Sequence, residues 1–440
     1  MNTDKEKVMF IMETTRNYSE FNGKKILFLG AHALTAHLIS KAKEMGVYTI
    51  VTDYVKDAPA KKLADEAYDI STLDIDALIN LAREKEVDGV FTGYVDINLA
   101  PCRKVCEALG LPFYATLDQL EQTMNKVNFK KNCRKHNIKV VDDVPEEYLD
   151  GKYENVQYPV IIKPADSYSS KGISVCFRKE EMQEALDKAM AVSTCKQIVA
   201  EQYLEAEDVY LYFTIQDGYL SLSAMADRLL NDEQYGCAPQ PVGYFFPSKY
   251  IDVYFEKVHA KLQAMMDDLG IRNGSFFMQG FIVDNDIIFF EMGLRLSGGA
   301  GYLQISHQNE INQVEMHLRY ALTGKFDGWD LKTYDNPRFH KPACVLVVLL
   351  SDGKIGNIQG LEEVRSHKNV FNILQFKHVG DELNARGTLN QVFARIYMAG
   401  NDETDLKNTI SYVKKNLSIT DVNGQNMILN LFDEGKVYED

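Results

Sequence analysis

The chain lacks several features that would assign it to a special class of protein. Its longest apolar run, ACVLVVLL at residues 343–350, is far shorter than the about 20 residues that a membrane-spanning helix needs. Its seven cysteines are scattered, and none belongs to a Cys-x-x-Cys pair or a zinc-type cluster. With no recognisable signal peptide either, this pattern favours a reduced, cytoplasmic protein. The apolar run itself predicts a buried strand.

The chain also has no excess of positive charge. The 440 residues include 48 Lys and Arg against 63 Asp and Glu, which gives a net charge of -15. A chain with this balance needs a local basic patch to bind nucleic acid, and its one basic stretch, residues 125–137, fits a single helix face. We therefore expect no nucleic-acid or membrane partner. Hydrophobic residues make up 45% and charged residues 25%, as is ordinary for a globular protein.

The order of the expected strands and helices predicts several domains, since a chain of this length exceeds one hydrophobic core. Strands and helices alternate from residue 24 to about residue 115, a pattern typical of a doubly wound parallel sheet. From about residue 331, short strands and one closing helix favour an antiparallel α+β unit. The fold class is thus α/β and α+β. The expected division is an extension at 1–22, a parallel-sheet domain at 23–115, a central domain at 116–330 with a smaller part at about 155–205, and a C-terminal domain at 331–440.

Residues 278–292, MQGFIVDNDIIFFEM, predict a β-hairpin that ends in a charged group. With a three-residue loop at 284–286, a common length, Gln279 falls directly opposite Glu291. Their Cβ atoms would be roughly 5 Å apart on one face, which suits two oxygen ligands of a hard cation such as Mg²⁺. A register slip of one residue would separate them. Alone, Glu291 is better explained as a solvated charge at a strand end; Arg295, four residues later, favours a site.

A second pattern, VIIKPADSYSSKGISV at residues 160–175, places a lysine at the end of an apolar strand. The ammonium group of Lys163 would lie beside a bound polyphosphate, and the polar loop after it supplies backbone N–H groups that close over phosphate oxygens. For Lys163, a surface lysine at a strand end is the weaker alternative, whereas for Lys171 a solvated lysine is the simpler one. The loop residues concerned are Ser169, Ser170, Lys171 and Gly172.

Together, the hairpin end and the lysine loop resemble the ATP-grasp superfamily. Within it they resemble the carboxylate–amine ligases similar to L-amino acid ligases, the carbamoyl phosphate synthase large subunit and biotin carboxylase. The resemblance extends from Lys24 over nearly the whole chain. It implies an ATP-grasp fold with an N-terminal doubly wound parallel-sheet domain, a central two-part ATP-binding domain with a mobile lid at 166–172, and a C-terminal α+β domain.

In that family the hairpin ends in Glu-x-Asn-x-Arg, two acidic strand residues bind magnesium, and the arginine stabilises an acyl-phosphate. The resemblance therefore implies a metal site at Gln279 and Glu291 and catalytic roles for Arg295 and Lys163. The chain departs from the family at two positions, because Gln279 replaces the usual first glutamate and Gly293 replaces the asparagine. A glutamine carbonyl carries no negative charge, so one of two magnesium ions is expected to bind weakly or to shift.

The resemblance also implies a nucleotide site. Lys126, in an Asn-Lys-x-x-Phe-Lys segment, would approach phosphate, whereas Lys130 and Lys131 are expected to be solvated helix charges. Asp208, with Glu207 as the neighbouring alternative, would hold the ribose hydroxyls. The residues implied to surround the base, through a main-chain hinge and apolar side chains, are Ile161, Glu201, Gln202, Tyr203, Leu204, Phe281 and Phe290.

The implied reaction is the ATP-dependent joining of a carboxylate to an amine through an acyl-phosphate, with ADP and phosphate as products. An L-amino acid ligase is one form of it. The implied cofactors are ATP and Mg²⁺, with Mn²⁺ as an alternative; the partners are small-molecule substrates, and a homodimer is frequent in the family.

Two other interpretations compete. An ATP-binding regulatory or degenerate protein without ligase activity is favoured by Gln279 and Gly293, but the joint presence of Lys163, Glu291 and Arg295 argues against it. A dinucleotide-binding first domain would need Gly-x-Gly-x-x-Gly after the first strand. That pattern fails, because a histidine stands where the second glycine lets the backbone approach pyrophosphate.

Overall fold

The computed structural model describes residues 17–167, 171–231, 239–384 and 387–429. Its first unit is a four-stranded parallel sheet with the order β3-β2-β1-β4, as the alternation of strands and helices predicts. The order reverses between β1 and β4, so the sheet is doubly wound. The strands are β1 (Lys25–Leu29), β2 (Tyr48–Thr52), β3 (Glu66–Tyr68) and β4 (Gly89–Phe91).

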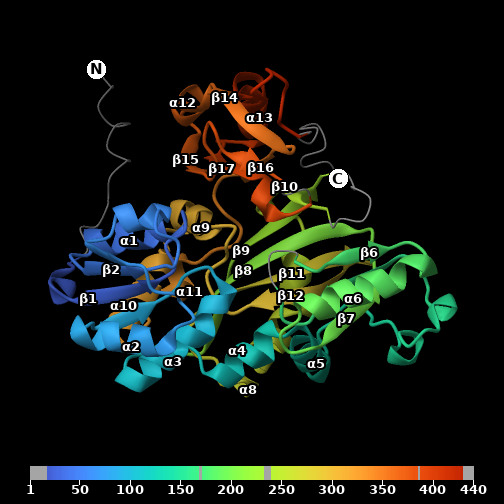
Figure 1. Ribbon diagram of the computed structural model, residues 1–440, viewed down its shortest axis with the longest axis horizontal. Coiled ribbons are helices and arrows are strands. Elements are labelled where there is room, and N and C mark those ends of the chain that lie inside the picture. Colours follow the sequence, from blue (N-terminus) through green and yellow to red (C-terminus); the bar gives the residue numbers. More distant parts are fainter. Residues whose placement is uncertain (1–16, 168–170, 232–238, 385–386, 430–440) are drawn as a thin grey trace.

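Helices cover both faces of this sheet because successive side chains of each strand point to opposite faces. In β1, Ile26 and Phe28 belong to one buried cluster and Leu27 and Leu29 to another. The helices on the first face are α1 (Thr35–Glu44) and α10 (Gln313–Thr323), and those on the second are α2 (Ile75–Glu84) and α3 (Leu99–Leu109). Helix α10 comes from a distant part of the sequence, yet it packs against β4. In Figure 1 it lies among the blue elements of the first sheet.

A smaller layer follows in the chain. Helices α4 (Leu117–Met124) and α5 (Lys126–Lys135) lead to a three-stranded antiparallel sheet of order β6-β5-β7, against which α6 (Met182–Val192) packs. Its strands are β5 (Val160–Pro164), β6 (Ser174–Cys176) and β7 (Ile198–Gln202). Helix α4 begins with a capping box, in which Thr116 and Gln119 exchange side-chain and backbone hydrogen bonds.

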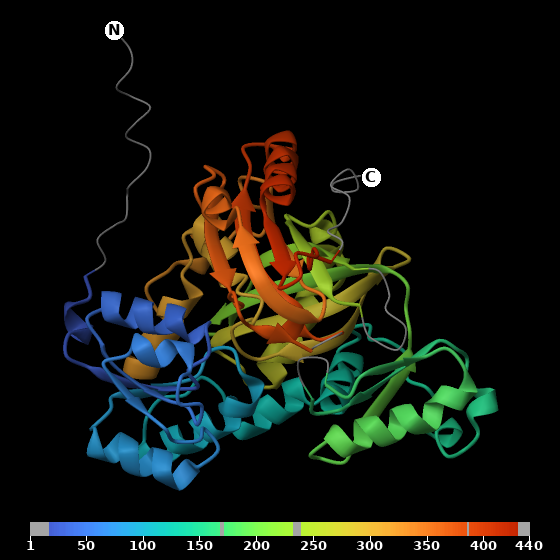
Figure 2. The same cartoon turned by 45° about the horizontal axis from the view of Figure 1, so that its top comes forward.

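The centre of the molecule is an eight-stranded antiparallel sheet, β12-β11-β8-β9-β10-β13-β17-β15. One face of its first strands packs on α4, α5, α7 (Ile251–Lys257) and α8 (His259–Asp268). The strands are β8 (Glu207–Gln216), β9 (Tyr219–Leu230), β10 (Pro241–Phe246), β11 (Gly274–Val283), β12 (Asp286–Gly293), β13 (Ala343–Leu349), β15 (Val370–Gln375) and β17 (Val392–Ala399). The sheet continues across the expected boundary at residue 331, and the domain limits stay predictions. The first sheet and the α6 layer lie at opposite ends of this centre (Figure 2).

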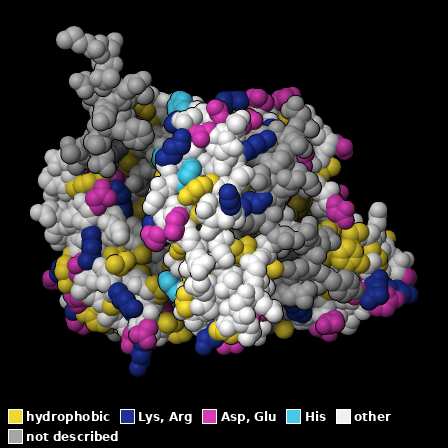
Figure 3. Space-filling model, turned by 90° about the horizontal axis from the view of Figure 1, so that it is seen from above, with side chains coloured by type: hydrophobic (Ala, Val, Ile, Leu, Met, Phe, Trp, Pro, Cys, Tyr) yellow, Lys and Arg dark blue, Asp and Glu magenta, His cyan; other side chains and the backbone are white. Residues whose placement is uncertain are grey.

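The C-terminal segment adds a third layer, with helices α12 (Leu361–Arg365) and α13 (Glu403–Asn416) in a common core with the last strands. A small sheet joins β14 (Gly353–Gln359), β16 (Glu382–Leu383) and β18 (Ser418–Asp421). The remaining helices are α9 (Tyr302–Asn309) and α11 (Leu331–Tyr334). No described helix has the length and apolar character needed to cross a membrane. Acidic and basic side chains are interspersed over the described part of the face in Figure 3.

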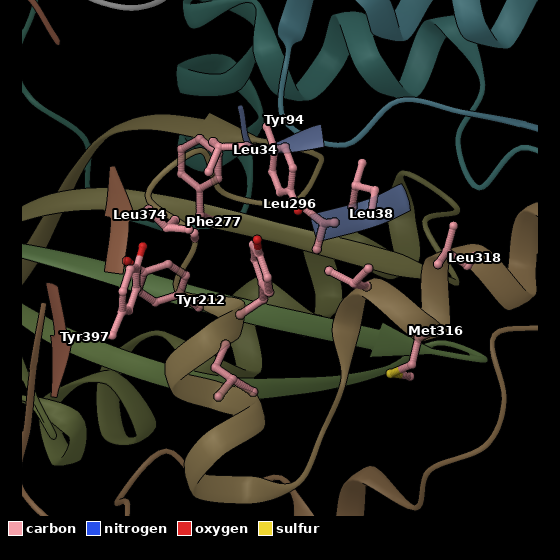
Figure 4. Close-up of a cluster of buried hydrophobic side chains, with 14 of the residues drawn as sticks. Leu34, Leu38, Tyr94, Tyr212, Phe277, Leu296, Met316, Leu318, Leu374 and Tyr397 are labelled. Carbon is pink, nitrogen blue, oxygen red and sulfur yellow. The ribbon is translucent and has the colours of Figure 1, made fainter. Parts of the chain in front are cut away.

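One hydrophobic cluster joins the first sheet to the central sheet and its last strands. It contains Tyr94 from the loop after β4, Phe277 from β11, Met316 from α10 and Tyr397 from β17, each of them buried. Figure 4 shows these side chains with Leu34, Leu38, Tyr212, Leu296, Leu318 and Leu374. Because loops of the first sheet and strands of the central sheet share this core, their relative positions are fixed beside the site described next.

Candidate functional site

The main cavity of the described structure, about 780 Å³, lies between the β5–β7 layer and the central sheet. It brings together most of the residues that the sequence singles out. Lys171 and Gly172 are not among its lining residues, and Ser169 and Ser170 lie outside the described residues. The predicted residues that do line it are Lys126, Ile161, Lys163, Glu201, Gln202, Tyr203, Leu204, Asp208, Gln279, Phe281, Phe290, Glu291 and Arg295.

The first sheet supplies another wall of the cavity. His32 follows β1, and Tyr94 and Asp96 follow β4, so all three stand at the carboxyl ends of the two strands between which the strand order reverses. This is where open α/β sheets bind ligands. Burial lowers the pKa of His32 to about 4, and the nearby Arg295 adds to this effect. His32 is therefore a neutral ring in the wall at neutral pH.

The β11–β12 hairpin reaches the expected pairing by an unexpected route. The three-residue loop is wrong: Val283 pairs with Asp286, and Asp284 and Asn285 form a two-residue turn with φ values of 50° and 56°. Such a turn alone would shift the register by one residue. A bulge next to Gln279 adds one residue to β12, and Gln279 still pairs with Glu291. The two shifts cancel, so the predicted pairing is confirmed.

Two lysines reach the cavity from different elements. Lys126 opens α5, and its Nζ donates to the carbonyl of Ser167 at 2.8 Å and lies 4.0 Å from Oε1 of Glu291. Burial lowers the pKa of Lys126, while the Glu291 carboxylate opposes this effect. Lys163 ends β5, and its Nζ lies 2.5 Å from Oε2 of Glu201 and 5.5 Å from the centre of the Phe290 ring. Both ammonium groups are buried yet line the cavity, where a polyanion would be strongly attracted.

Lys130 is not the solvated charge that the sequence suggests. Its side chain is 2% exposed and its Nζ donates to Oε1 of Glu201 at 2.7 Å and to Asp143. Glu201 thus holds Lys130 with one oxygen and Lys163 with the other. Burial of Lys130 is tolerated because the charge is paired. The i,i+4 spacing of Lys126 and Lys130, which places both on one face of α5, is the sequence signal that indicates this arrangement.

Arg228, on β9, is a cavity residue that the sequence analysis missed. Its Nε donates to Oδ1 of Asp208 at 2.8 Å, and its Nη2 donates to Oδ2. Burial raises the pKa of Asp208, and the guanidinium opposes this effect. Both oxygens of the expected ribose ligand are therefore already engaged. Glu207, the alternative, is exposed, pairs with Lys249 at 3.3 Å and is not among the lining residues, whereas Glu205 is.

A chain of side chains continues from Arg228 to the hairpin end. Nη1 of Arg228 donates to Oε1 of Gln279 at 2.7 Å, and Nε2 of Gln279 donates to Oε2 of Glu291 at 3.0 Å. No group of three or more His, Cys, Asp or Glu side chains suited to a metal occurs in the described ranges. The Gln279–Glu291 end thus offers one carboxylate rather than two.

Arg295 follows the hairpin and is held by Asp96, which the sequence analysis also missed. Nε and Nη2 of Arg295 donate to Oδ1 and Oδ2 of Asp96 at 2.6 and 2.5 Å, and Nη1 donates to the carbonyl of Leu296 at 2.9 Å. Burial alone would lower the pKa of Arg295, but the Asp96 carboxylate outweighs it and raises the pKa above its ordinary value. The guanidinium is thus a permanent positive charge at the edge of the cavity.

The C-terminal layer closes the other side. Arg395, on β17, lines the cavity and donates from Nη1 to the carbonyl of Gly298 at 2.5 Å, and the hydroxyl of Tyr397 donates to the carbonyl of Gly299 at 2.8 Å. These bonds fix the loop after Arg295 against β17. The cavity is therefore lined by the β5–β7 layer, the central sheet with β17, and the loops after β1 and β4.

Comparisons with known proteins agree with this arrangement. A family model described as "D-ala D-ala ligase C-terminus" matches residues 122–235. This region includes Lys126, Lys163 and strand β7. The chain's predicted resemblance to the ATP-grasp carboxylate–amine ligases is confirmed. Its predicted fold class is confirmed as well.

Individual proteins are similar to this chain, in sequence or in structure, over most of its length. A formate-dependent phosphoribosylglycinamide formyltransferase of Francisella tularensis subsp. tularensis is 27% identical over 367 residues, 79% of this chain and 87% of the relative. The structure of an L-amino acid ligase from Bacillus licheniformis superimposes with a TM-score of 0.73 at 17% identity, over 91% of this chain and 99% of the other. The biotin carboxylase domain of the Hydrogenobacter thermophilus 2-oxoglutarate carboxylase, solved with MgADP and bicarbonate, gives a TM-score of 0.72 at 16% identity, over 92% and 91% of the two chains.

Proposed function

We propose that this protein is an ATP-dependent ligase that joins a carboxylate to an amine through an acyl-phosphate. One observation carries the proposal: Lys126, Lys163, Glu291 and Arg295, from three separate segments, line one cavity. Phosphoryl transfer needs positive charge around the phosphates, and acyl transfer needs a fixed cation where negative charge develops. The combination in one cavity suits both steps.

The cavity fits a nucleotide. Its size lies within the range of small-molecule sites, which combine apolar walls with a few polar groups. Ile161 comes from one sheet, and the Phe281 and Phe290 rings, stacked 4.9 Å apart, come from the other. They would enclose the base, next to the main chain of residues 201–204, while Lys126 and Lys163 would meet the phosphates.

The same residues fit one divalent cation. Magnesium is commonly held by one or two carboxylates together with substrate phosphates and water, and Glu291 supplies one carboxylate at the lysine end of the cavity. Mg²⁺, or Mn²⁺ in its place, would neutralise phosphate charge there.

The chain's own groups would then act in sequence. Lys126 and Lys163 orient the triphosphate while an oxygen of the substrate carboxylate attacks the γ-phosphorus and the bond to the bridging oxygen of ADP breaks. Arg295, whose direction Asp96 fixes, stabilises the carbonyl oxygen as the amine attacks. Phosphate leaves as the C–N bond forms, and the amine loses a proton. Water must be kept away from the acyl-phosphate during these steps, because it would hydrolyse it.

The relatives, rather than the cavity, support a choice of candidate substrates. The curated relative uses formate and a phosphoribosylglycinamide, and the B. licheniformis neighbour is an L-amino acid ligase. Amino acids forming a dipeptide remain our first candidates for both substrates. A homodimer and a cytoplasmic location stay predictions; the described cysteines are all unpaired, which suits a reducing compartment.

A second candidate is nucleotide binding without ligation. It is favoured by the engagement of Gln279 with Arg228 and by the glycine at 293, both departures from the family pattern. Retained ATP binding with no turnover for any acceptor pair would support it.

The test is a phosphate-release screen of ATP with pairs of carboxylates and amines, followed by mass spectrometry of the products. Lys163→Met and Arg295→Lys should lower turnover by at least about 100-fold, because each removes a charge or geometry specific to the transition state. Lys261→Met and Arg365→Lys, on exposed helix positions outside the cavity, are the matched controls. Equal activity in the site variants and controls would refute the proposal.

A further inference from the structure

We infer that this protein uses a single divalent cation and that the guanidinium of Arg228 takes the place of a second one. The inference rests on the proposed ATP-dependent function and specifies which groups supply positive charge at its phosphate site. Its basis is the continuous chain Asp208–Arg228–Gln279–Glu291, whose four members all line the cavity.

The orientation of the Gln279 side chain is fixed by chemistry. A guanidinium only donates hydrogen bonds, and a carboxylate only accepts them. Gln279 lies between Arg228 and Glu291, so its carbonyl oxygen must face the arginine and its amide nitrogen must face the glutamate. The carbonyl oxygen that would ligate a second metal is thus occupied at 2.7 Å by Nη1 of Arg228.

The strand register makes this contact possible. Asp208 pairs with Arg228 between β8 and β9, and Gln279 pairs with Tyr210 between β11 and β8. The Arg228 side chain therefore crosses β8, with its guanidinium carbon 5.8 Å from the centre of the Tyr210 ring, and reaches β11. A cation over an aromatic ring gains additional stabilisation.

Two neighbouring side chains fix the position of Arg228. Asp208 holds it through Nε and Nη2, and Gln279 holds it through Nη1. Burial opposes the charge, but Asp208 outweighs burial and raises the pKa of Arg228. An arginine has five N–H groups; three are used here, and within the described ranges the other two meet no protein acceptor. These two remain for phosphate oxygens, which guanidinium binds well.

A glutamate at position 279 would add a second negative charge beside Glu291. It would face the Glu291 carboxylate at the present 3.0 Å contact, and two adjacent carboxylates require a cation or a proton between them. Glutamine removes that requirement by donating to Glu291. Gln279 and Arg228 thus act together: one removes the need for a second metal, and the other supplies positive charge without it.

The experiment counts bound Mn²⁺ by electron paramagnetic resonance in the presence of a non-hydrolysable ATP analogue, with nucleotide affinity measured separately by calorimetry. The wild-type chain should bind one Mn²⁺ per nucleotide. The double variant Gln279→Glu/Arg228→Gln should bind two. The single variant Arg228→Gln should keep one Mn²⁺ and bind the analogue about 10- to 100-fold more weakly, whereas Arg272→Gln, exposed and outside the cavity, should change neither value.

Two Mn²⁺ ions in the wild-type chain would overturn the inference, and so would a double variant that still binds one. Because Arg228→Gln leaves Asp208 buried without a partner, Asp208→Asn/Arg228→Gln serves as the background if the single variant fails to fold. Failure of nucleotide binding in every folded variant and in the wild-type chain would instead refute the proposed function.

Discussion

Asp96 and Arg295, 199 positions apart in the sequence, form a two-point ion pair in which both carboxylate oxygens accept from the guanidinium. The pair connects the loop after β4 to the end of the β11–β12 hairpin. It therefore links the wall provided by the first sheet to the wall that carries Glu291. The direction of the Arg295 side chain depends on a residue from another layer of the molecule.

Replacing Asp96 with Asn should impair catalysis without weakening nucleotide binding. The amide loses the charge and one of the two acceptors, so Arg295 is no longer fixed; we expect kcat to fall about 10- to 100-fold. Steady-state kinetics and calorimetric titration with ATP separate the two effects. Asp69→Asn, which removes an exposed ion pair with Lys61 in the same layer, is the control. A loss of ATP affinity equal to the loss in kcat would contradict this role.

Lys126 should make ATP use sensitive to alkaline pH. Burial lowers its pKa below the ordinary 10.5, so its positive charge is lost at a lower pH than for a free lysine. Since the charged form binds phosphate, kcat/KM for ATP should decline as the pH rises. The decline should begin at a lower pH than the one at which a free lysine loses its charge. In Lys126→Arg, the guanidinium stays charged, and the decline should move to higher pH. Profiles between about pH 7 and pH 10 test this; identical profiles would argue that another group causes the decline.

Gly293 is required by packing rather than by metal chemistry. A Cβ at this position would lie 2.4 Å from two ring carbons of Phe277, whose ring stacks on Tyr210 at 5.2 Å. Gly293→Asn should lower the free energy of unfolding by about 1–3 kcal/mol, and the added change Phe277→Leu should recover part of it. Gly298→Ala, where nothing lies within 4 Å of the added Cβ, is the control. Thermal unfolding gives the Tm of each variant. An undiminished Tm for Gly293→Asn would be inconsistent with this packing.

His317 should make the fold sensitive to acid. It is buried in α10 with both ring nitrogens unpartnered among the described residues, and its ring stacks on Phe91 at 5.6 Å. Burial lowers its pKa from 6.5 to about 3, so between these values the unfolded chain binds a proton that the native chain excludes. This residue's contribution to stability is therefore complete above pH 6.5 and falls by about 1.4 kcal/mol per pH unit below it.

His317→Phe removes this titration while keeping an aromatic ring in place. Denaturant unfolding at about pH 7.5 and pH 5 should show a loss of stability about 2 kcal/mol smaller in the variant than in the wild-type chain. The same pH dependence in both proteins would mean that His317 is not protonated on unfolding.

The parts of the site that sequence could predict are those encoded locally. The lysine that ends β5, the capping box of α4 and the carboxylate that ends β12 each follow from a short pattern of strand, cap or turn residues. The predicted three-residue loop of the hairpin was wrong. The two-residue turn is accompanied by a bulge, and nothing in the sequence indicates that bulge. The pairing of Gln279 with Glu291 survived because the bulge compensates for the shorter turn.

The residues that sequence could not predict are those whose role depends on contacts between layers. Asp96 follows a short strand and Arg228 lies inside a long one, and neither has a neighbour in sequence that indicates its partner. Lys130 was assigned to solvent because Glu201, which allows its burial, is 71 residues away. For Asp96, Arg228 and Lys130, the contact that defines the role of the side chain is made with a residue distant in sequence.

The proposed function requires that a substrate carboxylate attack the γ-phosphorus of ATP. The most direct test supplies the carboxylate found by the substrate screen with both oxygens labelled as ¹⁸O and examines the released phosphate by ³¹P nuclear magnetic resonance. An acyl-phosphate route transfers one ¹⁸O atom into each phosphate and yields ADP. Unlabelled phosphate, or AMP with pyrophosphate, would contradict the account.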